Sequence, residues 1–280
     1  MSGGAVRVRR HQWLMVAVVG VAGLLAFGWP LLVPPSGHIE QTQLGPLLFA
    51  LVLPALLAVV LSELTSNDLD VKALAMLGVL TAVGAVLRPL GASTGGLEAV
   101  YLPIILAGRV FGPGFGFVLG STTLFCSALL TGGVGPWLPY QMIAAGFVGL
   151  GAGLLPRLAG RAEVVMLAGY GFLAGFAYGW IMDFAFWPFS LGNGTQLSFD
   201  PAAGRLRNLH VFALYKLATA MAWDAGRALT NALLVASLGA PLLRVLRRAS
   251  RRANFVDAAR PGEPAGVPPG GRGTTGFTTG

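Results

Sequence analysis

The chain has 280 residues, of which 55% are hydrophobic and 11% are charged, whereas an ordinary soluble domain has roughly 25% charged residues. So few polar groups cannot cover a water-facing surface, which excludes a soluble enzyme and favours an α-helical integral membrane protein. The formal net charge of +8 is concentrated in arginine clusters at the edges of apolar runs, which argues against nucleic-acid binding. The single cysteine, Cys126, excludes an intrachain disulfide.

Two apolar runs follow the basic N-terminus at 1–12. A membrane-spanning helix needs about 20 apolar residues, and residues 13–33 and 44–61 meet this length. The first run is longer than the apolar region of a signal peptide, which has about 7–15 residues, and no small-residue cleavage site follows it. The sequence therefore predicts two transmembrane helices within 13–62, followed by a polar connection.

Six further apolar runs lie between residues 70 and 250 and predict a six-helix membrane core. The expected helices are 73–90, 99–111, 114–131, 137–155, 164–187 and 210–243. The last is expected to be one long helix that holds Lys216, Asp224 and Arg227. Residues 253–280 are rich in Pro, Gly and Thr, which predicts a disordered tail.

Charge placement gives the predicted helices a direction. Eight spans put both termini on one side of the membrane, and their basic character assigns that side to the cytoplasm. Arg109, Arg157 and Arg161 then also fall inside, while the predicted outer loops 34–43, 91–98 and 132–136 hold no Lys or Arg. The outer loop 188–209 is the exception, because it contains two arginines. We therefore expect a multi-pass protein of a bacterial cytoplasmic membrane with both termini in the cytoplasm.

Small residues recur at a spacing of four, which places them on one face of a helix. The sets are Gly112, Gly116 and Gly120; Ala145, Gly149 and Gly153; Gly171, Gly175 and Gly179; and the pair Gly78 and Ala82. Such faces let helix backbones approach closely in lipid. Packing within the chain is the favoured interpretation, and docking of a partner protein is the alternative.

Polar residues inside spans are expensive in lipid and therefore informative. Asp224 and Arg227 are three residues apart and are expected to form an ion pair. Asp183, Arg88 and Lys216 are expected near the outer surface, where their side chains reach water. Aromatic residues also gather toward the outer ends of the spans, either as an interfacial belt or as a stacking wall for a ligand. They are Tyr101, Trp137, Tyr140, Tyr178, Trp180 and Trp187.

Several motifs of enzymes are missing from the sequence. It contains no Walker A motif, no H-E-x-x-H, no G-x-S-x-G and no cluster of Cys and His. We therefore expect no catalytic residues, no metal ion and no cofactor.

Three segments carry a resemblance to a known family. They are YLPIILAGRVFGPGFG at 101–116, PYQMIAAGFVGLGAG at 139–153, and RALTN at 227–231 with LGAPLL at 238–243. Over about residues 70–250 the chain resembles S components of energy-coupling-factor (ECF) type ABC transporters. The resemblance implies a six-helix membrane subunit that captures a vitamin or related micronutrient and works with a coupling transmembrane subunit and two cytoplasmic ATPases.

The resemblance also implies where the substrate and the partner bind. Substrate would lie in an outward-facing pocket under the loops 91–98, 132–136 and 188–209, and the coupling subunit would dock on small residues of the first core helix, Gly78 and Ala82. The two additional N-terminal helices depart from the family. The expected substrate-binding residues are Tyr140, Gln141, Trp137, Trp180, Asp183, Asn193, Arg227 and Asn231.

Three functional hypotheses remain open at this point. The first is an S component for a vitamin-like molecule, and the aromatic-rich, long outer loops favour a large substrate such as cobalamin. The second is an intramembrane enzyme that acts on a lipid or isoprenoid and uses Asp183 with the Asp224–Arg227 pair, with or without a divalent metal ion. The third is a scaffold whose small-residue faces bind partner helices.

Overall fold

The computed structural model describes residues 20–21, 23–25, 27–32, 71–91, 94–191, 195–200 and 202–257. Within these residues all regular secondary structure is helical. The helices are α2 (Trp29–Leu32), α4 (Val71–Leu90), α5 (Tyr101–Phe111), α6 (Pro113–Thr131), α7 (Leu138–Leu154), α8 (Gly160–Ser190), α9 (Arg205–Thr219) and α10 (Met221–Asp257). Parts of α4, α6, α8 and α10 are long and apolar enough to cross a membrane. This agrees with the multi-pass helical membrane protein expected from the composition.

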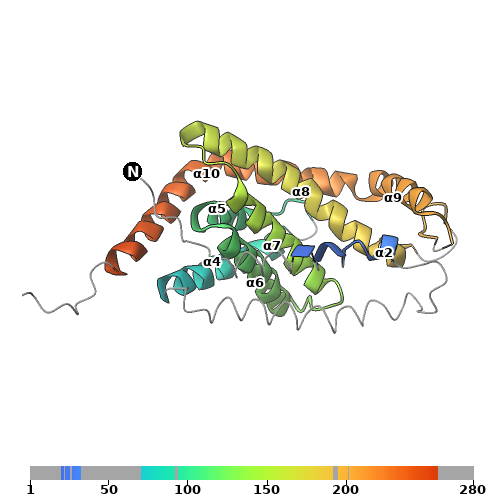
Figure 1. Cartoon of the computed structure of the whole chain (residues 1–280), viewed down its shortest axis with the longest axis horizontal. Coiled ribbons are helices and arrows are strands. Elements are labelled where there is room, and N and C mark those ends of the chain that lie inside the picture. The colour runs from blue at the N-terminus through green and yellow to red at the C-terminus, as the bar shows by residue number, and fades with distance from the viewer. Residues whose placement is uncertain are drawn as a thin grey trace, which may run out of the picture.

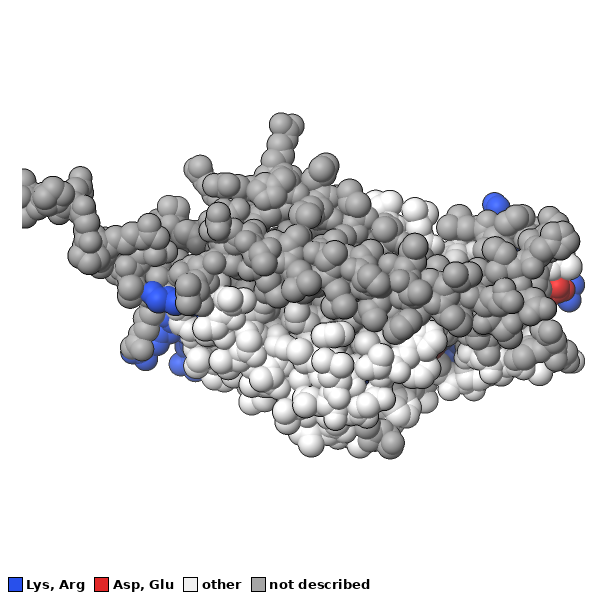
Figure 2. Space-filling view, turned by 90° about the horizontal axis from the view of Figure 1, so that it is seen from below, with Lys and Arg blue, Asp and Glu red and all other residues white. Residues whose placement is uncertain are grey.

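The surface of these helices has the character of a surface in contact with lipid. Val79, Val165, Leu173 and Leu233 are each 60–71% exposed, and large apolar side chains in such numbers would be unfavourable against water. Charged residues gather at the two ends of the long axis, and most of the described surface between them is white in Figure 2. An apolar middle between charged ends is the distribution expected of helices that cross a membrane.

The helices form a layered arrangement around α5. Helices α8 and α10 run side by side along the long axis, and α6 and α7 pack against each other on the other side of α5 (Figure 1). Helix α5 has only 11 residues, and all of its first eight are buried. Helix α4 packs on α6. Because α5 is short, its first residue, Tyr101, lies beside Tyr178 in the middle of α8, and a cavity forms next to this contact.

The small-residue faces at the α6–α7 contact explain why these two helices can pack so closely. A Cβ atom at Gly116 would collide with the backbone of Gly149, and a Cβ atom at Gly149 with the backbone of Gly116. Gly120 is likewise pressed against the backbone of Ala145. The predicted role of these two sets in packing within the chain is confirmed.

The set Gly171, Gly175 and Gly179 on α8 leaves room for α10 to pack closely. Gly175 faces the backbone of Ala228, and Gly179 faces the carboxylate of Asp224. The fourth set behaves differently, because nothing lies within 4 Å of a Cβ atom built on Gly78, and Ala82 is exposed. That face of α4 is not used for packing among the described residues.

An ion-pair cluster closes the end of the bundle opposite α9. Glu163, at the start of α8, is 1% exposed, and its Oε1 lies 2.7 Å from Nε of Arg109 and 2.5 Å from Nη2 of Arg247. Arg109 also donates to the carbonyl oxygen of Leu155. The three residues come from α8, α5 and α10, so that the cluster ties these helices together at the end that the charge pattern assigns to the cytoplasm.

Two predicted boundaries near the C-terminus were wrong. The helix expected at 210–243 is divided at Ala220 into α9 and α10, since Ala220 has φ −115° and ψ −8°. In a straight helix Lys216 and Asp224 would be about 12 Å apart along the axis, and the break accompanies an ion pair between them. The tail predicted as disordered from 253 is helical as far as Asp257.

Other predicted segments lie wholly or partly outside the described residues. The N-terminus at 1–12, the second additional helix at 44–61 and the tail after Asp257 are outside them. The first additional helix at 13–33 is described only in part, and its described residues are mostly helical. Its α2 portion packs on α8, where the indole Nε1 of Trp29 donates to the carbonyl oxygen of Ala185 at 2.9 Å.

Replacing Gly149 by alanine should destabilise the protein, because the added methyl group has no room between α6 and α7. We expect a loss of about 1–3 kcal/mol in the free energy of unfolding, measured by thermal or denaturant unfolding in detergent. Gly169→Ala on α8 is the control, since nothing lies within 4 Å of its Cβ position. Equal stability of both variants and the wild type would show that the close contact is absent.

Candidate functional site

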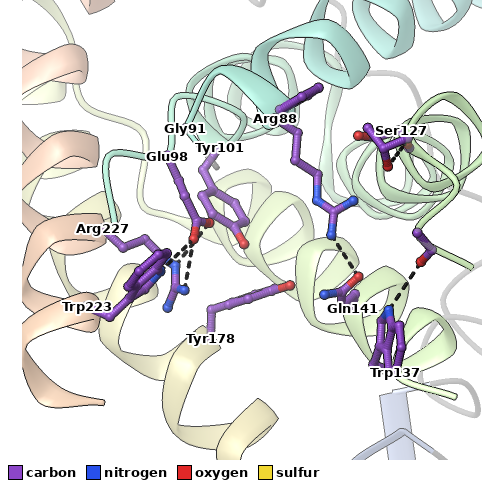
Figure 3. A pocket seen from close by; sticks show the side chains of 13 residues that line it. Arg88, Gly91, Glu98, Tyr101, Ser127, Trp137, Gln141, Tyr178, Trp223 and Arg227 are labelled. Atoms are coloured by element: carbon purple, nitrogen blue, oxygen red, sulfur yellow. Dashed lines mark hydrogen bonds and ion pairs between the residues drawn. The ribbon is translucent and has the colours of Figure 1, made fainter. Parts of the chain in front are cut away.

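A cavity of about 330 Å³ lies where the predicted outer ends of several helices meet. It is bounded by the end of α4, the start of α5, the α6–α7 turn, the middle of α8 and the start of α10 (Figure 3). Two of the predicted outer loops, 91–98 and 132–136, contribute to it, which places these loops at the same end of the molecule. The lining residues are Arg88, Pro89, Gly91, Glu98, Tyr101, Ser127, Thr131, Gly133, Trp137, Gln141, Tyr178, Trp223 and Arg227.

Glycines position the loop that delivers Glu98 to this cavity. Gly96 has φ +94°, a conformation that an L side chain rarely adopts, and its Cβ position is occupied by the backbone of Trp223 and Arg227. On the facing helix, a Cβ atom at Gly226 would collide with the carbonyl oxygen of Gly95. Glycine at both positions lets the loop lie directly on the first turns of α10.

The loop contact places the carboxylate of Glu98 against the guanidinium of Arg227. Nη2 of Arg227 lies 3.0 Å from Oε1 and Nε lies 3.1 Å from Oε2, so that the pair is bidentate. The indole Nε1 of Trp223 donates to the same Oε1 at 3.2 Å. Arg227 also lies over the ring of Tyr178, 5.0 Å from its centroid, which orients the phenol along the cavity wall (Figure 3).

The Glu98–Arg227 pair is one end of a longer series of alternating charges. Nη1 of Arg227 is 2.9 Å from Oδ1 of Asp224, which confirms the predicted ion pair. Oδ2 of Asp224 is 2.6 Å from Nζ of Lys216, and Lys216 also pairs with Asp183. We call these five residues, from Asp183 through Lys216, Asp224 and Arg227 to Glu98, the charge chain. It connects α8, α9, α10 and the loop before α5.

Lys216 does not reach water as predicted. Its side chain is fully buried, and Asp183 and Asp224 flank it from two helices. The prediction was wrong because it considered each charge alone, whereas the fold brings carboxylates from α8 and α10 to the lysine.

The opposite wall of the cavity carries a second arginine, Arg88, whose contacts differ from those of Arg227. Nη2 of Arg88 donates to Oε1 of Gln141 at 2.9 Å, and no carboxylate of the described residues lies within ion-pair distance of Arg88. Near it, the hydroxyl of Ser127 is fully buried and has no hydrogen-bond partner in the described part of the chain. Figure 3 shows Arg88 between the two tyrosines on one side and Ser127 and Trp137 on the other.

The predicted substrate-binding residues fall into two groups. Gln141, Trp137 and Arg227 line the cavity. The other described ones have contacts elsewhere. Tyr140 packs edge-on against Phe27 and Phe186, Trp180 packs on Phe212, Asp183 belongs to the charge chain, and Asn231 donates to the carbonyl oxygen of Gly171. Asn193 lies outside the described residues.

Several polar cavity residues were absent from the predicted set, among them Arg88, Glu98 and Ser127. Glu98 had a signal in the sequence, because it is the sole acidic residue between Asp70 and Glu163. Arg88 stood out only as a charge near the end of a span. Ser127 gave no signal, since a serine in an apolar run is commonplace.

Among the described residues, no three His, Cys, Asp or Glu side chains lie together in a way that could hold a metal ion. The cavity is lined by arginine, carboxylate and aromatic groups, which can bind organic molecules through ion pairs, hydrogen bonds and stacking. Comparisons with models of protein families, with curated proteins and with solved structures found no match to the chain.

Removing the amine of Lys216 should destabilise the protein strongly, because Asp183 would lose its cation and Asp224 would keep only Arg227. For Lys216→Met we expect a loss of about 3–5 kcal/mol in the free energy of unfolding. The double variant Lys216→Met with Asp224→Asn should recover part of this loss, since it removes one of the two carboxylates. The measurement is unfolding in detergent, and a Lys216→Met protein as stable as the wild type would contradict the buried ion pairs.

Proposed function

We propose that this protein is the substrate-capturing S component of an energy-coupling-factor transporter. The observation that carries the proposal is the cavity at the predicted outer end, which combines ionic and aromatic groups within an otherwise apolar membrane protein. Polar groups placed in a concave site between helices are typical of small-molecule binding sites. Helices α4, α5, α6, α7 and α8 occur at the places of the first five core helices expected from the resemblance, and α9 with α10 at the place of the sixth.

The two ends of the bundle support the predicted orientation. The loops 91–98 and 132–136 contribute to one end, at the cavity, while Arg109, Glu163 and Arg247 gather at the other. In the proposed orientation the cavity opens outward and the Glu163 cluster faces the cytoplasm, in accord with the basic C-terminal part of α10. Substrate would then be taken from outside the cell.

The size of the cavity favours a small substrate. Its volume of about 330 Å³ is at the lower end of the range for small-molecule sites, roughly 300–1,000 Å³. This supports a molecule with one or two rings better than cobalamin, which the long outer loops had favoured. The aromatic rings of Tyr101 and Tyr178, whose centroids are 5.1 Å apart, form an apolar wall against which such a ring can pack.

The face of α4 around Gly78 and Ala82 fits the proposed docking of a coupling subunit. Both residues are exposed, and Val79 and Val83 beside them are 60% and 46% exposed. A partner helix could approach this face closely, because its small residues leave the backbone accessible. The described part of the first additional helix packs on α7 and α8, and nothing lies within 4 Å of the Cβ position of Gly78.

The alternative of an intramembrane enzyme receives no specific support. Its carboxylates, Asp183 and Asp224, both pair with Lys216. They therefore stabilise a buried cation in this structure, and neither lines the cavity.

Thr131→Trp should block substrate capture, because Thr131 lines the cavity and an indole there would occupy its volume. Wild-type protein, purified from cells and then denatured, should release one enriched small molecule in close to equimolar amount, identified by mass spectrometry. Leu130→Trp is the matched control, since Leu130 is 69% exposed and outside the cavity, and it should release as much as the wild type. If the wild type releases no enriched molecule, the proposal fails.

Bulky residues on the small face of α4 should prevent assembly with the transporter. The variant Gly78→Leu with Ala82→Leu should lose co-purification with the coupling subunit and the ATPases when all are expressed together, because leucine side chains hold the helices apart. Gly169→Leu, at an exposed glycine of α8 with open space around it, should assemble normally. Retention of the complex by the α4 variant would exclude this docking face.

A further inference from the structure

Arg88 is the one guanidinium of the cavity wall that lacks a carboxylate among the described residues. Arg227, the other cavity arginine, forms ion pairs with Glu98 and Asp224. Within the described part of the chain, the only acceptor of Arg88 is the neutral amide oxygen of Gln141 at 2.9 Å. A guanidinium carries five N–H donors and keeps its charge at any physiological pH, so that most of its hydrogen-bonding capacity remains for another acceptor.

The groups beside Arg88 form a polar site open to the cavity. The amide of Gln141 accepts from Nη2 of Arg88 (Figure 3), which lines the cavity, and no other hydrogen bond of this guanidinium occurs within the described residues. Ser127 lines the same cavity and is 0% exposed, and its hydroxyl has no hydrogen-bond partner in the described part of the chain. A buried hydroxyl without a partner is unfavourable, and an acceptor placed between Ser127 and Arg88 would satisfy both.

The charges on the opposite wall limit how much negative charge a ligand can carry. The charge chain contains three carboxylates and two cations, and it ends in the cavity at Glu98. Its excess of one negative charge would repel a doubly charged phosphate more strongly than a singly charged carboxylate. A planar carboxylate also matches the fork of the guanidinium in a bidentate pair.

We infer that the captured molecule bears a single carboxylate, which is bound by Arg88 and Ser127 while the ring of the molecule packs against Tyr101 and Tyr178. The inference rests on the proposed function and specifies the chemical class of its substrate: a small, ring-bearing carboxylic acid. Gln141 is a positioning residue, because it acts through Arg88.

The molecule released from denatured wild-type protein tests this directly. At neutral pH it should be retained on an anion exchanger, lose that retention after methyl esterification, and keep it after treatment with phosphatase. A released molecule that is not retained, or whose retention is abolished by phosphatase, overturns the carboxylate and leaves the proposed function standing. Absence of any enriched molecule overturns the proposed function and the carboxylate together.

Variants at Arg88 test the assignment of the binding residue. Binding of the released molecule, added back to ligand-free protein and followed by tryptophan fluorescence, should weaken about 10- to 100-fold in Arg88→Met. Gln141→Leu should weaken it less, and Leu130→Trp should leave it unchanged. If Arg88→Met does not fold, Ser127→Ala supplies the test through the second contact, with a weakening of about 3- to 10-fold. Unchanged binding in Arg88→Met would overturn the assignment. If that variant does not fold, unchanged binding in Ser127→Ala would overturn it.

Discussion

Burial of charge in an apolar bundle is the constraint on which the rest of this structure depends. Lys216 is fully buried and Arg227 is 7% exposed, and a charge in such surroundings must be paired and hydrogen-bonded. The charge chain meets this requirement by joining α8, α9, α10 and the loop before α5. Because Glu98 is its last member, the same pairs that stabilise the helix contacts also fix the wall of the cavity.

The glycines make this arrangement possible. Gly179 leaves space on α8 for the carboxylate of Asp224, and Gly96 lets the loop bearing Glu98 lie on α10. On the other side of α5, the close contact between Gly116 and Gly149 holds α6 and α7 together, and their joined ends provide the Ser127 and Gln141 side of the cavity. These close backbone contacts thus fix two sides of the cavity, the one that carries the charge chain and the one that carries Ser127 and Gln141.

Much of the helical layout could be predicted from the sequence, because apolar runs and their charged boundaries report the length of a span locally. The α6 span was predicted within one residue, and the Asp224–Arg227 pair follows from spacing on one helix. The break at Ala220 could not be predicted, since it accompanies contacts of Lys216 with two other helices. For the same reason Tyr140 and Trp180 were placed in the expected site by their position near a span end, although the rotation of their helices directs them to Phe186 and Phe212.

An experimental structure of the purified protein in a lipid nanodisc would test the central claim most directly, namely that the charge chain is complete in itself and Arg88 is kept for a ligand. The account predicts Glu98 paired with Arg227, as here, and continuous density for a small molecule in contact with Arg88. A structure in which Arg88 pairs with Glu98, or in which protein side chains fill the cavity, would contradict it.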